Sequence, residues 1–276
     1  MGSDARPGPR GAVGGGPAGP VAAAPELRNG LLAERIDTVD LAIGPSSQSG
    51  VAVVLVGPDG QNRILVVPGA NGRVGVADVE RVERRLHTAR IVPVQLELPL
   101  GPVRAAVEAA GRLGVTVLLD PAPVPDGPLS AVFYSAHVVL TPNESEAAAS
   151  VGFDVSDDRT AEQAARLLLA RGAGGVLLKL GARGLLWATE RSCVRGPPLV
   201  VDVVDTVGAG DAVNGAFAAA LAGGATAVDA AHLAAAAGGL AVSRPGARSA
   251  MPTRAEVAAA RSQTREIATS LAPTSL

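Results

Sequence analysis

Short, continuous runs of apolar residues recur along this chain, and they alternate with segments whose apolar residues follow a helical period. Continuous apolar strands separated by helices indicate a parallel sheet that is covered on both faces. The pattern therefore predicts an α/β fold, a doubly wound parallel sheet with helices on both faces. Strands are expected at 91–98, 115–120, 137–142, 175–181, 184–189 and 199–205. Helices are expected at 78–89, 103–113, 144–150, 161–171, 209–221, 226–240 and 253–269.

Residues 1–30 differ in composition from the rest of the chain. Gly, Pro and Ala dominate, and no helix or strand period is visible. Such a segment buries too little apolar surface to offset the entropy lost on ordering, so we expect 1–30 to be a disordered, low-complexity tract. The folded domain is expected over 31–276. Within it, two apolar runs of 50–71 flank Pro58-Asp59-Gly60, which predicts a β-hairpin.

The charge and residue counts narrow the possible partners. Lys and Arg number 24 against 26 Asp and Glu, for a net charge of -2, and no basic run occurs. This balance, with one Trp, one Tyr and three Phe, argues against nucleic acid or a membrane surface as partner. Cys193 is the only cysteine, which excludes an intramolecular disulfide and favours the reducing cytoplasm. The Ala- and Gly-rich stretch 213–242 contains Asp229 and His232, so we interpret it as two packed helices.

Two aspartates bracket a turn of small residues in the stretch DTVGAGD, residues 205–211. The turn leads into a predicted helix, and its small residues let backbone N–H groups approach a ligand closely. A helix N-terminus adds unpaired donors and a positive dipole end, which together suit a phosphoryl group in transfer. Asp211, in the first helical turn, could accept the proton of an attacking hydroxyl, while Asp205 could hold a cation or a sugar hydroxyl. Alternatively, Asp211 only stabilises the helix dipole and the glycines serve packing.

The longer stretch DTVGAGDAVNGAF (205–217) resembles the C-terminal signature of the ribokinase, or PfkB, family of sugar kinases. The resemblance runs in order from about Leu31 to the C-terminal region. Its other segments are VQLELP (94–99), LDPAP (119–123), TPNESEA (141–147), LKLGARG (178–184) and AVSRPGA (241–247). The resemblance implies a ribokinase-like fold and transfer of the ATP γ-phosphoryl group to the primary hydroxyl of a sugar. The substrate it implies first is ribose, giving ribose 5-phosphate, with Mg²⁺ and K⁺ as cofactors.

The resemblance also implies a role for each matched residue. Asp211 would be the base, and Gly208, Ala209 and Gly210 would form the anion hole. Asp205 and Glu97 would contact the sugar, and Glu146 would place Mg²⁺ through water. The nucleotide would be bound by Asn143, Lys179, Leu180, Gly181, Ala182, Arg183, Gly184 and Gly210. The K⁺ site would comprise Asp205, Val207, Ala241, Arg244, Gly246 and Ala250, where Ala250 replaces a serine often found in the family.

Each of these residues also has a purely structural interpretation. Asn143 could simply cap the helix that begins at Glu144, because Asn is a favoured N-cap. Glu144 and Glu146 could be solvated acids of the first helical turn, and Glu97 a surface residue at a strand end. Lys179, at the end of an apolar strand, could extend its ammonium group into solvent.

Two segments that the resemblance leads us to expect are not found in this sequence. They are a first strand with an aspartate that contacts the sugar, and a Gly-Gly-x-Gly-x-Asn stretch. The tract 1–30 stands in their place, which suggests a truncation, a misplaced start codon or a frameshift. We therefore expect an incomplete small β lid, of which the hairpin at 50–71 remains, and a weakened lid-to-lid homodimer. Two alternatives stay open, a family member acting on fructose, a nucleoside or a deoxy sugar, and an impaired remnant that binds nucleotide only.

Overall fold

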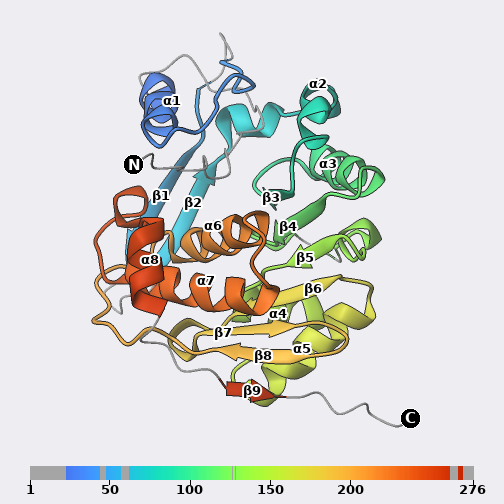
Figure 1. The fold of residues 1–276 in the computed structure, drawn as a ribbon. Helices are drawn as coiled ribbons and strands as arrows, with labels where there is room; N and C mark the ends of the chain where they lie inside the picture. Colours follow the sequence, from blue (N-terminus) through green and yellow to red (C-terminus); the bar gives the residue numbers. More distant parts are fainter. Residues whose placement is uncertain are drawn as a thin grey trace, which may run out of the picture. The chain divides into compact units, whose positions relative to one another are not determined.

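The computed structural model describes residues 23–43, 48–56, 62–125, 127, 129–261 and 267–269. The chain divides into two compact units (Figure 1). The first comprises Met1–Thr88 and Leu96–Ala109, and the second comprises Ala89–Gln95 and Ala110–Leu276.

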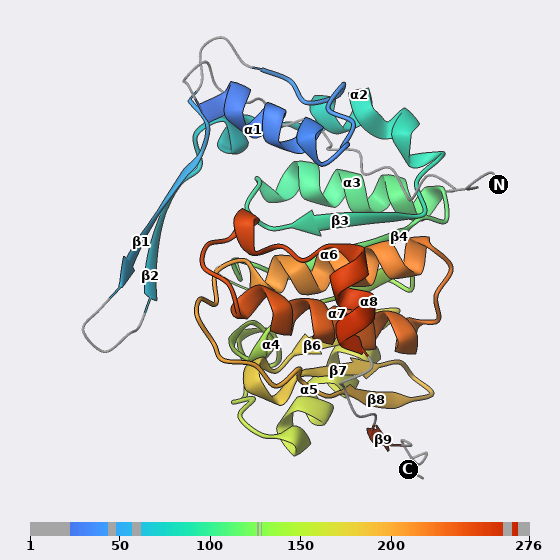
Figure 2. The same cartoon turned by 60° about the vertical axis from the view of Figure 1, so that its left-hand side comes forward.

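The first unit contains the predicted hairpin. Its strands β1 (Val51–Val56) and β2 (Asn62–Val67) pair antiparallel, with Val51 opposite Val67, and Figure 2 shows them as a two-stranded ribbon. The turn 57–61 lies outside the described residues. The other elements are α1 (Ala23–Ala33), η1 (Gly69–Arg73), α2 (Val76–Leu86) and α3 (Leu100–Arg112), whose last residues belong to the second unit.

Helix α1 differs from the predicted disordered tract 1–30 over its last eight residues, 23–30. The described part of that tract, from Ala23 onward, is helical. Pro25 lies in the first turn, where its missing N–H group costs no intrahelical bond, and Glu26 there interacts favourably with the helix dipole. The Ala and Leu residues that follow have high helix propensity, although they show no clear amphipathic period. Residues 1–22 lie outside the described part of the chain.

The second unit is built on a seven-stranded sheet with the strand order β3-β4-β5-β6-β7-β8-β9. The strands are β3 (Ile91–Gln95), β4 (Thr116–Asp120), β5 (Val138–Leu140), β6 (Gly175–Lys179), β7 (Leu185–Ala188), β8 (Cys193–Gly196) and β9 (Ile267–Thr269). β3 to β6 are parallel, as predicted. β6 to β9 pair antiparallel. For β6, β7 and β8 the reason is that their connections are far shorter than a parallel crossover requires.

Two further element predictions were wrong. The segment 199–205 is not a strand: Val200 and Val203 are 94% and 65% exposed, and the N–H group of Val204 donates to the carbonyl of Val242 instead of to a strand. The unpredicted strand β8 provides the partner of β7. The predicted helix 253–269 is α8 (Arg254–Arg261), and 267–269 form β9 because they pair with β8.

Helices cover both faces of this sheet. Figure 1 shows α6 (Ala209–Ala222) and α7 (Ala227–Val242) on one face, and α4 (Glu144–Val151) and α5 (Asp158–Ala170) on the other. A Cβ atom added at Gly238 of α7 would lie 2.8 Å from Val213 of α6, so small residues allow these two helices to pack closely. The ring centroids of Trp187 and Phe217 lie 5.3 Å apart in the core between the sheet and α6. Among the described residues, no helix has the length and apolar character to cross a membrane.

Candidate active site

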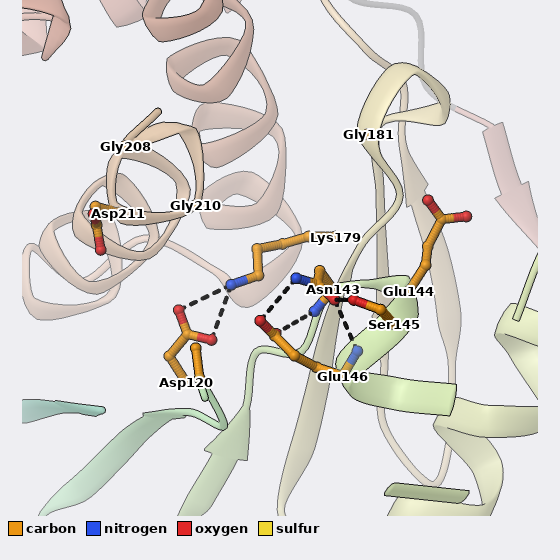
Figure 3. A pocket seen from close by; sticks show the side chains of 11 residues that line it. Asp120, Asn143, Glu144, Ser145, Glu146, Lys179, Gly181, Gly208, Gly210 and Asp211 are labelled. Carbon is orange, nitrogen blue, oxygen red and sulfur yellow. Dashed lines mark hydrogen bonds and ion pairs between the residues drawn. The ribbon is translucent and has the colours of Figure 1, made fainter. Parts of the chain in front are cut away.

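A pocket of about 540 Å³ lies in the second unit, at the carboxyl edge of the parallel strands (Figure 3). Asp120 and Lys179 are the last residues of β4 and β6, and Asn143 forms an isolated bridge with Lys179. Chain segments far apart in sequence therefore meet at one edge of the sheet. The lining residues are Asp120, Ala122, Asn143, Glu144, Ser145, Glu146, Lys179, Gly181, Gly208, Gly210 and Asp211.

The N-terminus of α6 forms one wall of this pocket. Gly208 caps the helix in the left-handed region, with φ 77° and ψ -1°, where a residue with a Cβ atom is strained. The helix begins at Ala209, as predicted, and the N–H group of Ala212 makes the first intrahelical bond, to the Gly208 carbonyl at 2.9 Å. The N–H groups of Gly210 and Asp211 in that first turn have no intrahelical acceptor, so they are available to an anion.

Asp211 opens into the pocket from the first turn of α6. Its Oδ1 atom accepts a hydrogen bond of 3.4 Å from the side-chain amide of Gln95, at the end of β3. Although the side chain is exposed on the pocket surface, the pocket walls exclude part of the surrounding water, and this desolvation raises the pKa of Asp211. The charge of Asp120 raises that pKa further, while the charge of Lys179 lowers it. A carboxylate with a raised pKa is a stronger proton acceptor than an ordinary aspartate.

A buried charge network that sequence reasoning did not assign lies beside Asp211. The ammonium group of Lys179 lies 2.9 and 3.0 Å from the two carboxylate oxygens of Asp120, and the amide of Asn214 donates to the same carboxylate at 2.6 Å. Asp120 is 5% exposed and the Lys179 side chain 12%. Lys179 is thus paired and does not extend freely into solvent. The position of Asp120 at a strand end was the available signal, but only the fold shows its partners.

Asn143 and Glu146 form a reciprocal cap at the start of α4. The side-chain oxygen of Asn143 accepts from the N–H group of Glu146, and the two Glu146 oxygens accept from the N–H group and the amide of Asn143, each at 2.7 Å. Burial raises the pKa of Glu146. Asn143 is therefore a true N-cap that also lines the pocket, so its structural and ligand-binding interpretations do not exclude each other.

Only some of the residues in the turn after β6 that were predicted to bind the nucleotide line the pocket. Lys179 and Gly181 line the pocket, whereas Leu180 is buried. Arg183, in η3 (Gly181–Arg183), pairs with Glu144 at the start of α4 and donates to Asp158 at 2.6 Å. Glu144 is therefore not a freely solvated acid. Ala182, Arg183 and Gly184 do not line the pocket. The ion pairs of Arg183 hold the turn against the N-termini of α4 and α5.

The segments predicted to hold K⁺ meet at Asp205. Its carboxylate accepts from the N–H groups of Val207 at 3.0 Å and Gly246 at 2.9 Å, and these bonds lower the pKa of Asp205. The two loops on either side of α6 and α7 are thereby joined. Ala241 lies near the end of α7, and Arg244 pairs with Glu256 at 2.6 Å.

Two further predicted residues, Ala250 and Glu97, do not line the pocket. Ala250 is fully buried in η4 (Arg248–Ala250), and its methyl side chain offers no oxygen ligand to a cation. Glu97 is exposed and belongs to the first unit, and its contact with a sugar stays a prediction.

The sequence of the chain matches a known protein family. Residues 12–254 match the model of the pfkB family carbohydrate kinases, and this range begins earlier in the chain than the resemblance seen in the sequence. A ribokinase of Haemophilus influenzae is 32% identical over 230 residues, which are 83% of this chain and 74% of that protein. A ribokinase of Schizosaccharomyces pombe is 34% identical over 84% of this chain and 74% of its own length.

A solved structure is similar over nearly the whole chain. The structure of Arabidopsis thaliana ribokinase complexed with ribose and ATP superimposes with a TM-score of 0.78 at 28% identity, over 91% of this chain and 80% of that one. The family match covers well over half of the present chain. The chain belongs to the pfkB family of carbohydrate kinases.

Proposed function

We propose that this protein is an ATP-dependent sugar kinase that phosphorylates the primary hydroxyl group of D-ribose to give D-ribose 5-phosphate. The observation that carries the proposal is the position of Asp211, a carboxylate with a raised pKa beside the free N–H groups of a helix N-terminus, in a pocket of about 540 Å³. The similarity to curated ribokinases over more than four-fifths of the chain supports ribose as the substrate.

In this proposal Asp211 accepts the proton of the sugar hydroxyl as that oxygen attacks the γ-phosphorus atom. The bond from phosphorus to the bridging oxygen breaks, and ADP leaves with the electron pair. The N–H groups of Gly210 and Asp211 donate to the phosphoryl oxygens, on which negative charge accumulates. Gly208 makes this arrangement possible, because its left-handed conformation turns the chain into α6 at the pocket wall.

ATP would lie along Asn143, Lys179 and Gly181, which line the same pocket. Mg²⁺ would neutralise the phosphates. Among the described residues, no three His, Cys, Asp or Glu side chains are grouped closely enough to hold a metal ion by themselves. This fits an ion that arrives with the nucleotide and keeps several waters, with Glu146 reaching it through one of them.

A potassium ion would lie beside Asp205 and favour the anion-binding turn. The backbone carbonyl groups of Val207, Ala241, Arg244 and Gly246 would hold it. The support is the position of Asp205, whose carboxylate joins the loops that carry Val207 and Gly246. Asp205 would contact the sugar, as the resemblance implies, and the sugar contact of Glu97 stays a prediction.

A homodimer is part of the same proposal. Apolar side chains of the β1–β2 hairpin are exposed, including Val51, Leu65 and Val67 at 56%, 62% and 55%. Analytical ultracentrifugation, with Leu65→Ser as the variant, tests whether the hairpin pairs with a second copy. A chain that stays monomeric at all concentrations would contradict the proposed homodimer.

The experiment for the proposed reaction is a coupled assay of ADP formation by the purified chain with ATP, Mg²⁺ and K⁺. Ribose, 2-deoxyribose, fructose and a nucleoside are compared as acceptors, and Asp211→Asn is the inactive control. We expect ADP formation that requires ribose and is lost in Asp211→Asn. Binding of ATP without turnover of any acceptor would refute the proposed function and leave a nucleotide-binding protein.

A further inference from the structure

The proposed function places Lys179 along the nucleotide but gives no role to its ion pair with Asp120. Lys179 is the only lysine in the chain, and its ammonium group lies 2.9 Å from an oxygen of a carboxylate that is 5% exposed. Removing two charges from water costs free energy that an apolar pair would avoid. The amide of Asn214 holds the same carboxylate, although the oxygen of that amide is buried without a partner.

The pair lies directly beside the reacting groups. A Cβ atom added at Gly210 would be 3.5 Å from the Lys179 ammonium nitrogen, so the charge sits against the turn that begins α6. Figure 3 shows Lys179 reaching Asp120 between the Asn143–Glu146 cap and the turn that carries Asp211. A charge at this position acts on whatever carboxylate and phosphate groups the pocket holds, because partly buried charges are weakly screened.

We propose that Asp120 and Lys179 are a matched pair of positioning residues whose opposite charges cancel, so that Asp211 stays ionised and able to accept the hydroxyl proton. The inference rests on the proposed function of the pocket. Asp120 without Lys179 would be a second negative charge beside Asp211, and one proton would then be shared between two carboxylates. Lys179 without Asp120 would be an uncompensated positive charge that makes Asp211 a weaker base.

The other groups around Asp211 do not supply this balance. Gln95, at the end of β3, is neutral, and Glu146 of α4 bonds to Asn143. Helix α7, which packs against α6, carries Asp229, paired with Arg261, and His232, which is buried. Of the charged groups among the described residues of the second unit, Asp120 and Lys179 are those whose charges act on Asp211, and they act in opposite directions.

The test uses three variants of the full chain: Asp120→Asn, Lys179→Met and the double variant. The pH profile of kcat/KM for ribose is measured for each. We expect the acid limb to move to lower pH in Asp120→Asn, to higher pH in Lys179→Met, and to return toward the wild-type position in the double variant. A displacement of about half a pH unit changes the rate on the acid limb about threefold, which the assay resolves.

A second measurement makes the inference independent of turnover. The Asp211 carboxyl carbon is titrated by NMR in protein labelled with ¹³C-aspartate and free of ligands, and Asp211→Asn assigns the signal. We expect the titration midpoint of Asp211 to move to lower pH in Asp120→Asn and to higher pH in Lys179→Met. If Lys179→Met does not fold, Lys179→Gln replaces it, because its amide can still donate to Asp120.

The outcomes separate the two proposals. If the acid limb of kcat/KM moves in the same direction in both single variants, with reduced kcat, the inference is overturned and Asp120 and Lys179 have a purely structural role. Opposite displacement in the NMR titration of a chain without sugar kinase activity would support the charge balance and reject the proposed function. Turnover of ribose with unmoved profiles would reject the charge balance alone.

Discussion

Replacement of Gly208 by Ala tests whether the left-handed turn before α6 is what builds the phosphoryl site. Gly208 has φ 77°, a conformation that costs a residue with a Cβ atom about 1–2 kcal/mol. The added methyl group would also lie 3.1 Å from the end of the Met251 side chain, 3.2 Å from the Ala247 Cα atom and 3.3 Å from its Cβ atom. Met251 can rotate away, but the backbone of Ala247 must move by a few tenths of an ångström.

We therefore expect Gly208→Ala to lower the free energy of unfolding by about 1–2 kcal/mol. The matched control is Gly215→Ala in the middle of the same helix. Gly215 is exposed, and an added Cβ atom would meet no other atom within 4 Å. This substitution should raise the free energy of unfolding by about 0.5–1 kcal/mol, because Ala loses less backbone entropy than Gly in a helix. The two glycines of one helix should thus respond with opposite signs.

The assay is urea unfolding followed by the fluorescence of Trp187, the only tryptophan, which is buried and packs against Phe217 of α6. The turnover number is measured in parallel. We expect it to fall tenfold or more in Gly208→Ala, since loss of one donor to a developing anion costs about 10²–10³ in rate. It should stay at the wild-type level in Gly215→Ala. Equal stability changes in the two variants, or full activity in Gly208→Ala, would refute the reasoning.

Four further outcomes follow from the site. Asp211→Asn should lower kcat by about 10²–10⁴ while ATP still binds, as measured by calorimetry. In the proposed mechanism Asp211 must be ionised, so kcat/KM of the wild type should fall as the pH drops through the raised pKa of Asp211. Arg183→Met should raise the KM for ATP and change unfolding by about 1 kcal/mol or less, because its ion pairs are partly exposed; an unchanged KM would contradict the positioning of the turn. Asp205→Ala removes the acceptor of two backbone N–H groups, and the K⁺ concentration for half-maximal activity should rise; an unaltered K⁺ response would place the ion elsewhere. Burial raises the pKa of Cys193 to about 11, so iodoacetamide at pH 8 should label it only as fast as the protein opens; rapid labelling of the native chain would be inconsistent with its 2% exposure.

Features that depend on neighbours in sequence were predictable. The hairpin of β1 and β2, the start of α6 at Ala209 and the N-cap at Asn143 all arise from residues close together in the sequence. The helical tract from Ala23 was missed because Ala and Leu form helices without an amphipathic pattern. The run 199–205 was misjudged because consecutive valines favour a strand wherever a partner is free, and β8 occupies that place beside β7.

By itself, the sequence determined the alternation of apolar strands with helices and the small-residue turn that ends at Asp211, since both depend on local periodicity and backbone freedom. Only the tertiary structure decided what surrounds Asp211. Lys179 and Asp120 are 59 residues apart, and Gly246 and Asp205 are 41 apart, yet each pair bonds directly. Contacts between residues so distant in sequence depend on how the strands are ordered and how the helices pack. That order placed a compensated charge pair, instead of a solvated lysine, beside Asp211.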